Sequence, residues 1–344
     1  MKIAFFDAKP YDLPGFEKYT AGTGLQFKYF DTRLNADTVS LAAGFDGVCV
    51  FVNDTVNEAV VNSLHEMGVK VIALRCAGFN NVDTRACFGK IHVYRVPAYS
   101  PYAVAEHAMA LLLTLNRKIH KAYIRTREFN FALSGLTGFD LHGKTVGIIG
   151  TGKIGQIFAG ICSGFGMTVL AYDKYPNPSL GLKYAELGEI FEKSDVISLH
   201  CPLTDQTHHL INDNSVKKMK KGVILVNTSR GGLIDTESLI NGIKVEIIGG
   251  AALDVYEEEA DLFYEDKSGG IVQDDKLVRL IAMPNVIVTS HQAFLTKEAL
   301  DNIASTTVAN LRKFFSGEGD PYTEVCYHCP RKDDCRKQRN QKCF

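Results

Sequence analysis

Three glycines, Gly150, Gly152 and Gly155, have the spacing Gly-x-Gly-x-x-Gly and are preceded by an apolar strand candidate and followed by a helix candidate. In that context the first glycine permits a tight turn, the second lets backbone amides approach a pyrophosphate, and the third allows close packing. The N-terminus of the following helix adds partial positive charge. The spacing therefore predicts a dinucleotide-binding loop rather than a glycine turn that only packs a helix.

An acidic residue, Asp173, ends the next strand candidate, residues 168–172, and lies eighteen residues after Gly155. A carboxylate at this position accepts hydrogen bonds from the adenosine ribose and repels a 2′-phosphate. We therefore expect the cofactor to be NAD rather than NADP.

Further titratable groups follow later strand candidates. The guanidinium of Arg230 suits a carboxylate, and the imidazole of His291 exchanges protons near neutral pH. Such groups, with an acid, can clamp a substrate acid, polarise its carbonyl and supply a proton as a hydride arrives. Taken singly, an arginine here is also typical of a surface ion pair, and a lone histidine of a structural role. The acids that could reach the site are Asp254, Glu257, Glu258 and Glu259.

Parallel strands are needed to bring these groups together, because their carboxyl ends meet at one edge of the sheet. Short apolar runs alternate with amphipathic stretches along the chain, which is typical of a doubly wound α/β fold. The strand candidates are 2–6, 27–30, 47–52, 69–74, 92–96, 144–149, 168–172, 195–200, 222–227, 246–252 and 286–290.

A length of 344 residues favours two domains. A helix that begins at Tyr102 is predicted to continue without interruption through residues 117–128 and to lead into the second domain. A second helix, from 296 to about 315, is predicted to return to the first domain. We predict two doubly wound parallel-sheet domains, the first of them discontinuous.

The composition excludes several classes of protein. Apolar residues make up 46% of the chain, which argues against disorder, and 38 basic residues against 39 acidic ones leave no basic field for nucleic acid. Asp7 interrupts the apolar start of the chain, and no uncharged apolar run reaches the roughly 18 residues of a membrane helix. We expect a cytoplasmic protein without nucleic-acid or membrane partners.

Six segments, in this order, resemble the NAD-dependent D-2-hydroxyacid dehydrogenase family, and within it the fermentative D-lactate dehydrogenases of bacteria. The similarity spans residues 1 to about 320. It implies a Rossmann NAD-binding domain, 101–296, inserted into a discontinuous flavodoxin-like substrate domain, 1–100 with 297–320, and it leaves 321–344 as a basic, cysteine-rich tail. The segments are 74–83 (LRCAGFNNVD), 96–101 (VPAYSP), the Gly150 loop, 227–231 (NTSRG), 254–257 (DVYE) and 291–296 (HQAFLT).

The resemblance implies that Arg230 binds the substrate carboxylate and carbonyl, that His291 is the acid/base, and that Glu259 pairs with His291. A carboxylate beside an imidazole favours its charged form and keeps a proton available for the nascent alkoxide. In the family, backbone amides of Ala77 and Gly78 would bind the substrate carboxylate. Tyr99 and Phe294 would border the side-chain pocket, with packing as the alternative for both.

The resemblance also implies the residues that surround the cofactor, although Asp254 is alternatively suited to cap a helix. These residues are Gly150, Gly152, Lys153, Ile154, Gly155, Asp173, Cys201, Pro202, Thr207, Thr228, Ser229, Arg230 and Asp254.

The expected reaction is the reversible reduction of pyruvate to D-lactate by NADH, in a homodimer or higher homo-oligomer. One alternative is an enzyme for larger 2-oxo acids, because one methylene in an apolar pocket changes discrimination only about 10- to 200-fold. Another, from a different class, is an NAD-sensing corepressor that keeps the fold.

The last nineteen residues lie outside the resemblance and hold six Lys or Arg residues against two acids. Four thiolates close together can surround Zn²⁺ or hold an iron–sulfur cluster, and His328 could replace one sulfur. A reduced flexible tail or a redox-active tail is the alternative. The candidate ligands are Cys326, Cys329, Cys335 and Cys343.

Overall fold

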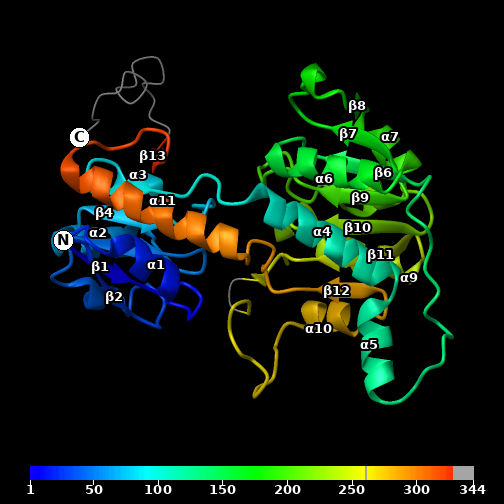
Figure 1. The fold of residues 1–344 in the computed structure, drawn as a ribbon, viewed down its shortest axis with the longest axis horizontal. Coiled ribbons are helices and arrows are strands. Elements are labelled where there is room, and N and C mark those ends of the chain that lie inside the picture. The colour runs from blue at the N-terminus through cyan, green and yellow to red at the C-terminus, as the bar shows by residue number, and fades with distance from the viewer. Residues whose placement is uncertain (260–261, 328–344) are drawn as a thin grey trace. The chain divides into compact units, whose positions relative to one another are not determined.

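The structure is a computed structural model that describes residues 1–259 and 262–327 (Figure 1). The chain divides into two compact units. Unit 1 comprises residues 1–100 together with the chain from residue 295 onward, and unit 2 comprises residues 101–294.

Unit 1 is built on a sheet in the order β13-β5-β4-β3-β1-β2. The five strands β1 to β5 are parallel and have the order of a flavodoxin-like sheet, because the chain moves outward from β1 in both directions. Two-residue β13 (Glu324–Val325) pairs antiparallel with β5 and was not predicted, since two residues carry no periodicity. The parallel strands are β1 (Lys2–Phe5), β2 (Gln26–Tyr29), β3 (Gly47–Val50), β4 (Val71–Leu74) and β5 (His92–Tyr94).

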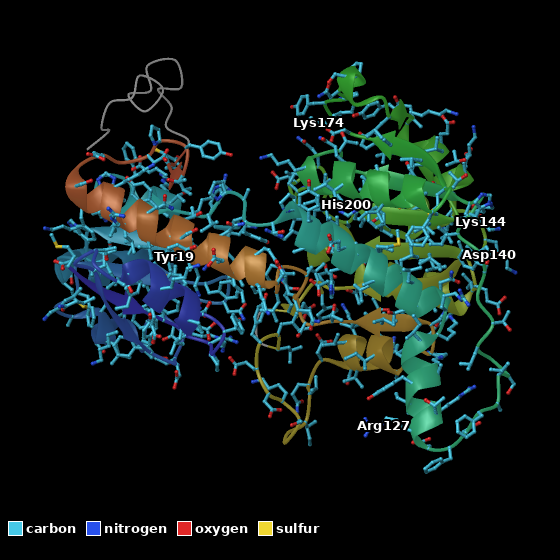
Figure 2. All side chains as sticks on the ribbon, in the orientation of Figure 1. Tyr19, Arg127, Asp140, Lys144, Lys174 and His200 are labelled. Carbon is cyan, nitrogen blue, oxygen red and sulfur yellow. The ribbon has the colours of Figure 1, made fainter. Side chains whose placement is uncertain are left out.

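The helix α11 (Lys297–Ser316) belongs to unit 1 and packs on α1 (Leu13–Thr20). Its residues Ala304, Val308 and Leu311 share one core with Phe5 and Phe16. Tyr19, labelled in Figure 2, donates a 2.6 Å hydrogen bond to Asp301 of α11. The helix α11, near the C-terminal end of the chain, therefore completes the hydrophobic core of unit 1. Two further helices of the unit are α2 (Glu58–Glu66) and α3 (Thr84–Cys87).

Unit 2 contains a parallel sheet in the order β12-β11-β10-β9-β6-β7-β8. The chain winds outward from β6 to β8 and then crosses to β9, so the strand order reverses between β6 and β9. Ligands of this fold bind beyond the carboxyl ends of the strands at such a reversal. The predicted pair of doubly wound α/β sheets is confirmed. The strands are β6 (Thr145–Ile149), β7 (Thr168–Tyr172), β8 (Lys183–Tyr184), β9 (Val196–Leu199), β10 (Val223–Asn227), β11 (Ile248–Leu253) and β12 (Val286–Val288).

Alternate residues of the central strands enter two cores, one on each face of the unit 2 sheet. On β10, Leu225 belongs to one core and its neighbours Ile224 and Val226 to the other. A strand buried on both faces reads as a continuous apolar run, as β10 does. The helices of unit 2 are α4 (Pro101–Asn116), α5 (Ile119–Arg127), α6 (Lys153–Gly164), α7 (Leu187–Lys193), α8 (Asp213–Val216), α9 (Thr236–Lys244) and α10 (Asp275–Ala282).

The prediction of one helix from Tyr102 through residues 117–128 is wrong. The helix α4 ends at Asn116, and Lys118 adopts a left-handed φ of +54° that stops its continuation into α5. The Asn116 side chain bonds the backbone of Phe139, accepting from its N–H at 3.0 Å and donating to its carbonyl at 2.7 Å. A distant segment therefore sets this break. Within the described residues, no helix is long and apolar enough to cross a membrane.

Candidate active site

The glycine loop joins β6 to α6 at the reversal point of the unit 2 sheet. Gly150 has a φ of +100°, and a β-carbon there would lie 2.6 Å from the Cys201 nitrogen. A β-carbon on Gly155 would lie 2.0 Å from the Gly150 carbonyl oxygen, whereas one on Gly152 would meet nothing within 4 Å. The loop is thus closed on its protein side and open at the N-terminus of α6, where Lys153 and Ile154 begin the helix. This shape fits a pyrophosphate against backbone N–H groups.

The Asp173 carboxylate lies beside this loop, at the end of β7. It accepts hydrogen bonds from Thr151 N (2.7 Å), Thr151 Oγ1 (3.0 Å) and Tyr175 N (2.9 Å). Burial raises the pKa of Asp173, but these hydrogen bonds outweigh it and leave the pKa below its ordinary value. The carboxylate is therefore ionised and held in place, as recognition of a ribose requires.

The loops after β9 and β10 are tied to each other. Ser229 Oγ donates to the carbonyl of buried Cys201 at 2.8 Å, and Thr207 Oγ1 donates to the Pro202 carbonyl at 2.7 Å. In contrast, the hydroxyl oxygen of Thr228 is buried and has no hydrogen-bond partner among the described residues. A buried hydroxyl without a partner is costly, so a bound polar group beside Thr228 would satisfy it. This orphan atom fits a cofactor at the end of β10.

Arg230 leaves the end of β10 through a turn that Asn227 holds. The Asn227 side chain donates to the Arg230 carbonyl at 2.9 Å and accepts from Ser229 N at 3.0 Å. The half-buried guanidinium donates through Nη1 to the Ser229 carbonyl at 2.6 Å. Its remaining N–H groups are available to a planar, bidentate acceptor such as a carboxylate.

His291 and Glu259 form a pair, with His291 Nδ1 2.7 Å from Glu259 Oε1. The second carboxylate oxygen accepts from Tyr256 N at 2.9 Å, and Tyr264 Oη donates to the His291 carbonyl at 2.9 Å. Both paired side chains are about one fifth exposed. Because Nδ1 faces Glu259, Nε2 is the ring atom that can exchange a proton with a substrate.

The backbone of His291 is strained, with a left-handed φ of +51° that a non-glycine residue rarely adopts. Asp254, fully buried, holds this turn. Its carboxylate accepts from Thr289 Oγ1 (2.5 Å), Gln292 N (2.9 Å) and Ala293 N (2.8 Å). The carboxylate therefore positions the turn at His291, and the contact of Asp254 with the cofactor stays a prediction. Among the described residues Asp254 caps no helix.

Unit 1 holds three of the other predicted substrate residues, Ala77, Gly78 and Tyr99. Ala77 and Gly78 lie on the loop after β4, where Arg95 Nη1 donates to the Ala77 carbonyl at 2.8 Å. Asn302 of α11 donates to the Tyr99 carbonyl at 2.7 Å and so anchors that segment. In unit 2, Phe294 is only 7% exposed. A hydrogen bond from Arg95 thus holds the loop that carries the amides of Ala77 and Gly78. Phe294 packs mainly in the protein interior.

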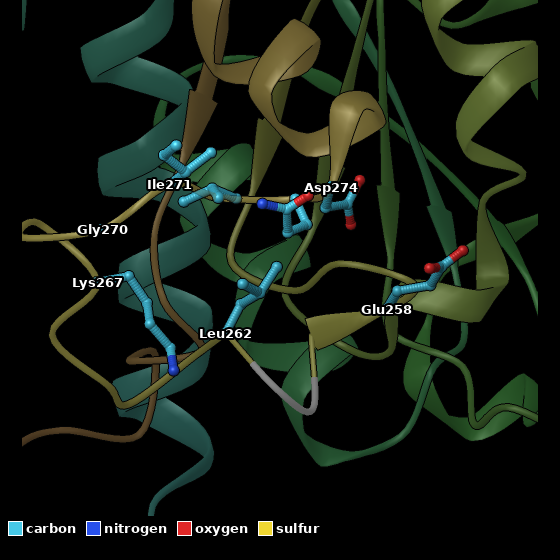
Figure 3. Close-up of a pocket in the computed structure, with 8 residues that line it drawn as sticks. Glu258, Leu262, Lys267, Gly270, Ile271 and Asp274 are labelled. Atoms are coloured by element: carbon cyan, nitrogen blue, oxygen red, sulfur yellow. The ribbon is translucent and has the colours of Figure 1, made fainter.

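The three consecutive glutamates have different surroundings, and only one of them contacts His291. Glu259 meets His291, Glu257 meets His209 at 2.5 Å, and Glu258 lines a separate pocket of about 370 Å³ (Figure 3). Of the predicted site residues, the candidate acid Glu258 lines that pocket and the others do not. Its lining is Glu258, Leu262, Lys267, Gly270, Ile271, Val272, Gln273 and Asp274.

Sequence reasoning missed Tyr264 and Thr289, which contact His291 and Asp254. Tyr264 lies in a loop without periodicity, so no local pattern marks it. Of the four tail cysteines, Cys326 is half-buried, and Cys329, Cys335 and Cys343 lie outside the described residues.

The geometry can be set beside known proteins. The model of the family described as "D-isomer specific 2-hydroxyacid dehydrogenase, NAD binding domain" matches residues 109–293. The chain is 51% identical over 326 residues to D-lactate dehydrogenase of Escherichia coli (strain K12), covering 93% of this chain and 99% of that one. It is 53% identical over 323 residues to a 2-hydroxyacid dehydrogenase homolog of Haemophilus influenzae, covering 92% and 97%.

Two solved structures extend the comparison. The apo-structure of D-lactate dehydrogenase from Escherichia coli has a TM-score of 0.86 and 48% identity, covering 94% of this chain and 100% of that chain. The structure of D-2-hydroxyisocaproate dehydrogenase has a TM-score of 0.82 and 33% identity, covering 95% and 100%.

Proposed function

Because the chain belongs to the D-isomer specific 2-hydroxyacid dehydrogenases, an NAD-dependent family of oxidoreductases, we propose that it is a D-lactate dehydrogenase that interconverts pyruvate and D-lactate. The single observation that supports this most directly is the His291–Glu259 pair, aligned after β12 on the same sheet edge as Arg230 after β10. The greater identity to D-lactate dehydrogenase than to D-2-hydroxyisocaproate dehydrogenase favours pyruvate over longer 2-oxo acids.

In the proposed reaction the Arg230 guanidinium binds the pyruvate carboxylate and polarises its carbonyl oxygen. NADH, when bound, supplies the hydride. His291 Nε2 gives a proton to the oxygen that becomes the hydroxyl, and Glu259 stabilises the imidazolium before that transfer. In the reverse direction neutral His291 takes the hydroxyl proton, and Glu259 again stabilises the charged ring.

In this proposal the Gly150 loop and Asp173 hold the cofactor, and the backbone amides of Ala77 and Gly78 bind the substrate carboxylate. Tyr99 and Phe294 are proposed to limit the space for the substrate side chain. Of these two, the buried position of Phe294 favours an indirect role as a wall.

A steady-state assay tests the proposal. Pyruvate, 2-oxobutyrate, phenylpyruvate and hydroxypyruvate are each supplied with NADH and with NADPH, and the product is analysed on a chiral column. We expect the highest kcat/KM for pyruvate with NADH and a D-configured product. Preference for phenylpyruvate would make the chain an enzyme for larger 2-oxo acids, and binding of NADH without turnover of any substrate would favour the corepressor-type alternative.

We further propose a homo-oligomer in a reducing, cytoplasmic compartment. Apolar side chains after α5 are strongly exposed, with Phe129 84%, Phe131 71% and Leu133 80% accessible, which is typical of a surface that another subunit covers. Cys49, Cys87, Cys162 and Cys201 are buried free thiols, as expected where disulfides are not formed. Sedimentation of the full chain would measure the number of subunits.

For the C-terminal cysteines, a Zn²⁺ or iron–sulfur site stays a prediction from the sequence. Its test is metal analysis of anaerobically purified protein together with titration of the tail thiols. A metal-free chain with four reactive tail thiols would contradict it.

A further inference from the structure

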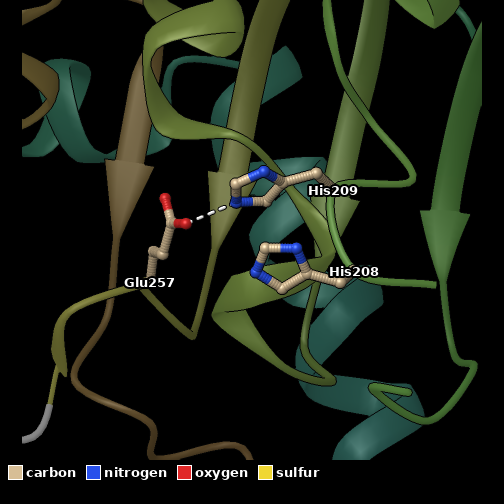
Figure 4. Close-up of side chains that lie close together, drawn as sticks. All are labelled: His208, His209 and Glu257. Carbon is tan, nitrogen blue, oxygen red and sulfur yellow. Dashed lines mark hydrogen bonds and ion pairs between the residues drawn. The ribbon is translucent and has the colours of Figure 1, made fainter. Parts of the chain in front are cut away.

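His208, His209 and Glu257 form a cluster that the dehydrogenase reaction does not use (Figure 4). The two histidines are adjacent in the loop before α8, and Glu257 belongs to the loop after β11. The imidazole rings stack with centroids 3.8 Å apart, and His209 Nε2 lies 2.5 Å from Glu257 Oε1. One ligand atom from each residue lies within 4.8 Å of the other two.

We propose that these three residues form a binding site for a Zn²⁺ ion. Two imidazoles and one carboxylate, with water in the fourth position, are a known ligand set for zinc. Tetrahedral zinc at its usual bond lengths places ligand atoms about 3.3 Å apart, so the stacked imidazoles, 28° from parallel, would rotate apart until one nitrogen of each faces the ion. The ion would replace the direct His209–Glu257 contact.

The surroundings of Glu257 favour an ion over a simple histidine–carboxylate pair. Thr236 Oγ1 donates to Glu257 Oε2 at 2.9 Å and orients the carboxylate as an outer-shell partner would, leaving Oε1 for the ion. His208 is exposed and adds a second nitrogen that the pair alone does not need.

The position of the cluster links it to the catalytic residues. A β-carbon on Gly231, the residue after Arg230, would lie 2.0 Å from the Tyr256 carbonyl oxygen, so the two loops are in tight contact. Tyr256 N in turn donates to Glu259. An ion that holds Glu257 thus acts on the backbone that positions Arg230 and Glu259. We expect it to slow turnover by roughly threefold or more, because small displacements of reacting groups are costly.

Calorimetric titration with ZnCl₂ tests the binding. The full chain carries C326S, C329S, C335S and C343S so that tail thiols contribute nothing, and His208→Phe is the test variant because it keeps a ring beside His209. We expect one Zn²⁺ per chain in the parent and at least about tenfold weaker binding in His208→Phe. His65→Phe, which removes an exposed histidine elsewhere, is the control and should bind as the parent does.

Cobalt gives a readout that is independent of affinity. Co²⁺ in the proposed site should give the visible absorption of a nitrogen and oxygen environment without a thiolate charge-transfer band, and Glu257→Gln should weaken that absorption. Absence of stoichiometric Zn²⁺ binding, or equal binding by parent and His208→Phe, would overturn the site.

The slowing of turnover rests on the proposed function, whereas the binding does not. Pyruvate reduction is therefore measured with and without saturating ZnCl₂ in the same two proteins. Slowing in the parent but not in His208→Phe supports the link to the catalytic loops, and equal rates with and without Zn²⁺ in the parent overturn that link. A chain that binds Zn²⁺ but never reduces pyruvate would fail the proposed function alone.

Discussion

The replacement Asp254→Asn distinguishes a residue that positions His291 from one that binds the cofactor. Aspartate and asparagine are nearly the same size, so the replacement alters hydrogen bonding and charge with little change in volume. Asparagine keeps one acceptor oxygen and replaces the other by an amide donor. If the retained oxygen faces Thr289 and Gln292, the buried N–H of Ala293 loses its acceptor.

The magnitude follows from these bonds. A buried donor left unsatisfied costs about 1–3 kcal/mol, and the left-handed backbone of His291 costs a similar amount, on the order of 1–3 kcal/mol, which the Asp254 bonds offset. If displacing the turn adds about 1.4–2.8 kcal/mol to the barrier, kcat falls roughly 10- to 100-fold. The affinity for NADH should stay nearly unchanged, because the carboxylate is fully buried.

The assay measures kcat and KM for pyruvate, the dissociation constant of NADH by fluorescence, and unfolding in urea. Asp195→Asn is the matched control: Asp195 also accepts from a backbone N–H, that of Thr145 at 2.9 Å, but at the start of β6 and away from the site. It should lose stability without the large loss of kcat. If Asp254→Asn instead weakened NADH binding tenfold and kept kcat, the positioning argument would be refuted.

Four further changes test the remaining assignments. Arg230→Gln should raise KM for pyruvate and lower kcat, because a charged bidentate contact is lost. The combined loss in kcat/KM should be at least about 100-fold, and NADH binding should be retained. An unchanged rate with pyruvate would contradict the role of Arg230. Glu259→Gln should lower kcat for pyruvate reduction, because a neutral amide does not stabilise the charged imidazole, and a kcat identical to the parent's would argue against the pair. Asp173→Ala should reduce the preference for NADH over NADPH, measured as the ratio of kcat/KM, and unaltered selectivity would assign the ribose to another residue. Burial lowers the pKa of His200 to about 4. Protonation of His200 on unfolding therefore removes stability as the pH falls from about 6.5 toward 4. His200→Gln should reduce the loss of unfolding free energy between pH 7 and pH 5 by about 2 kcal/mol at most, and an equal loss in parent and variant would contradict this cause.

Some features of this protein follow from the sequence because they depend on neighbouring residues. Apolar runs such as 223–227 predict buried strands, and the Gly150 loop depends on the strand and helix that flank it directly. Arg230 and His291 were placed at one edge of the sheet because parallel strands bring their carboxyl ends there. The resemblance then selected Glu259, and in the structure this acid contacts His291.

Other features depend on contacts between distant segments, which periodicity does not encode. The break after Asn116 requires the backbone of Phe139, and the turn at His291 requires the buried carboxylate of Asp254, thirty-seven residues earlier. The sequence alone does not distinguish Glu257, Glu258 and Glu259, because the direction of a side chain in a loop depends on the tertiary contacts of that loop. The residue types and their positions at strand ends thus predicted the class of reaction. The partner of each titratable group depends on how the loops pack together, which only the tertiary structure determines.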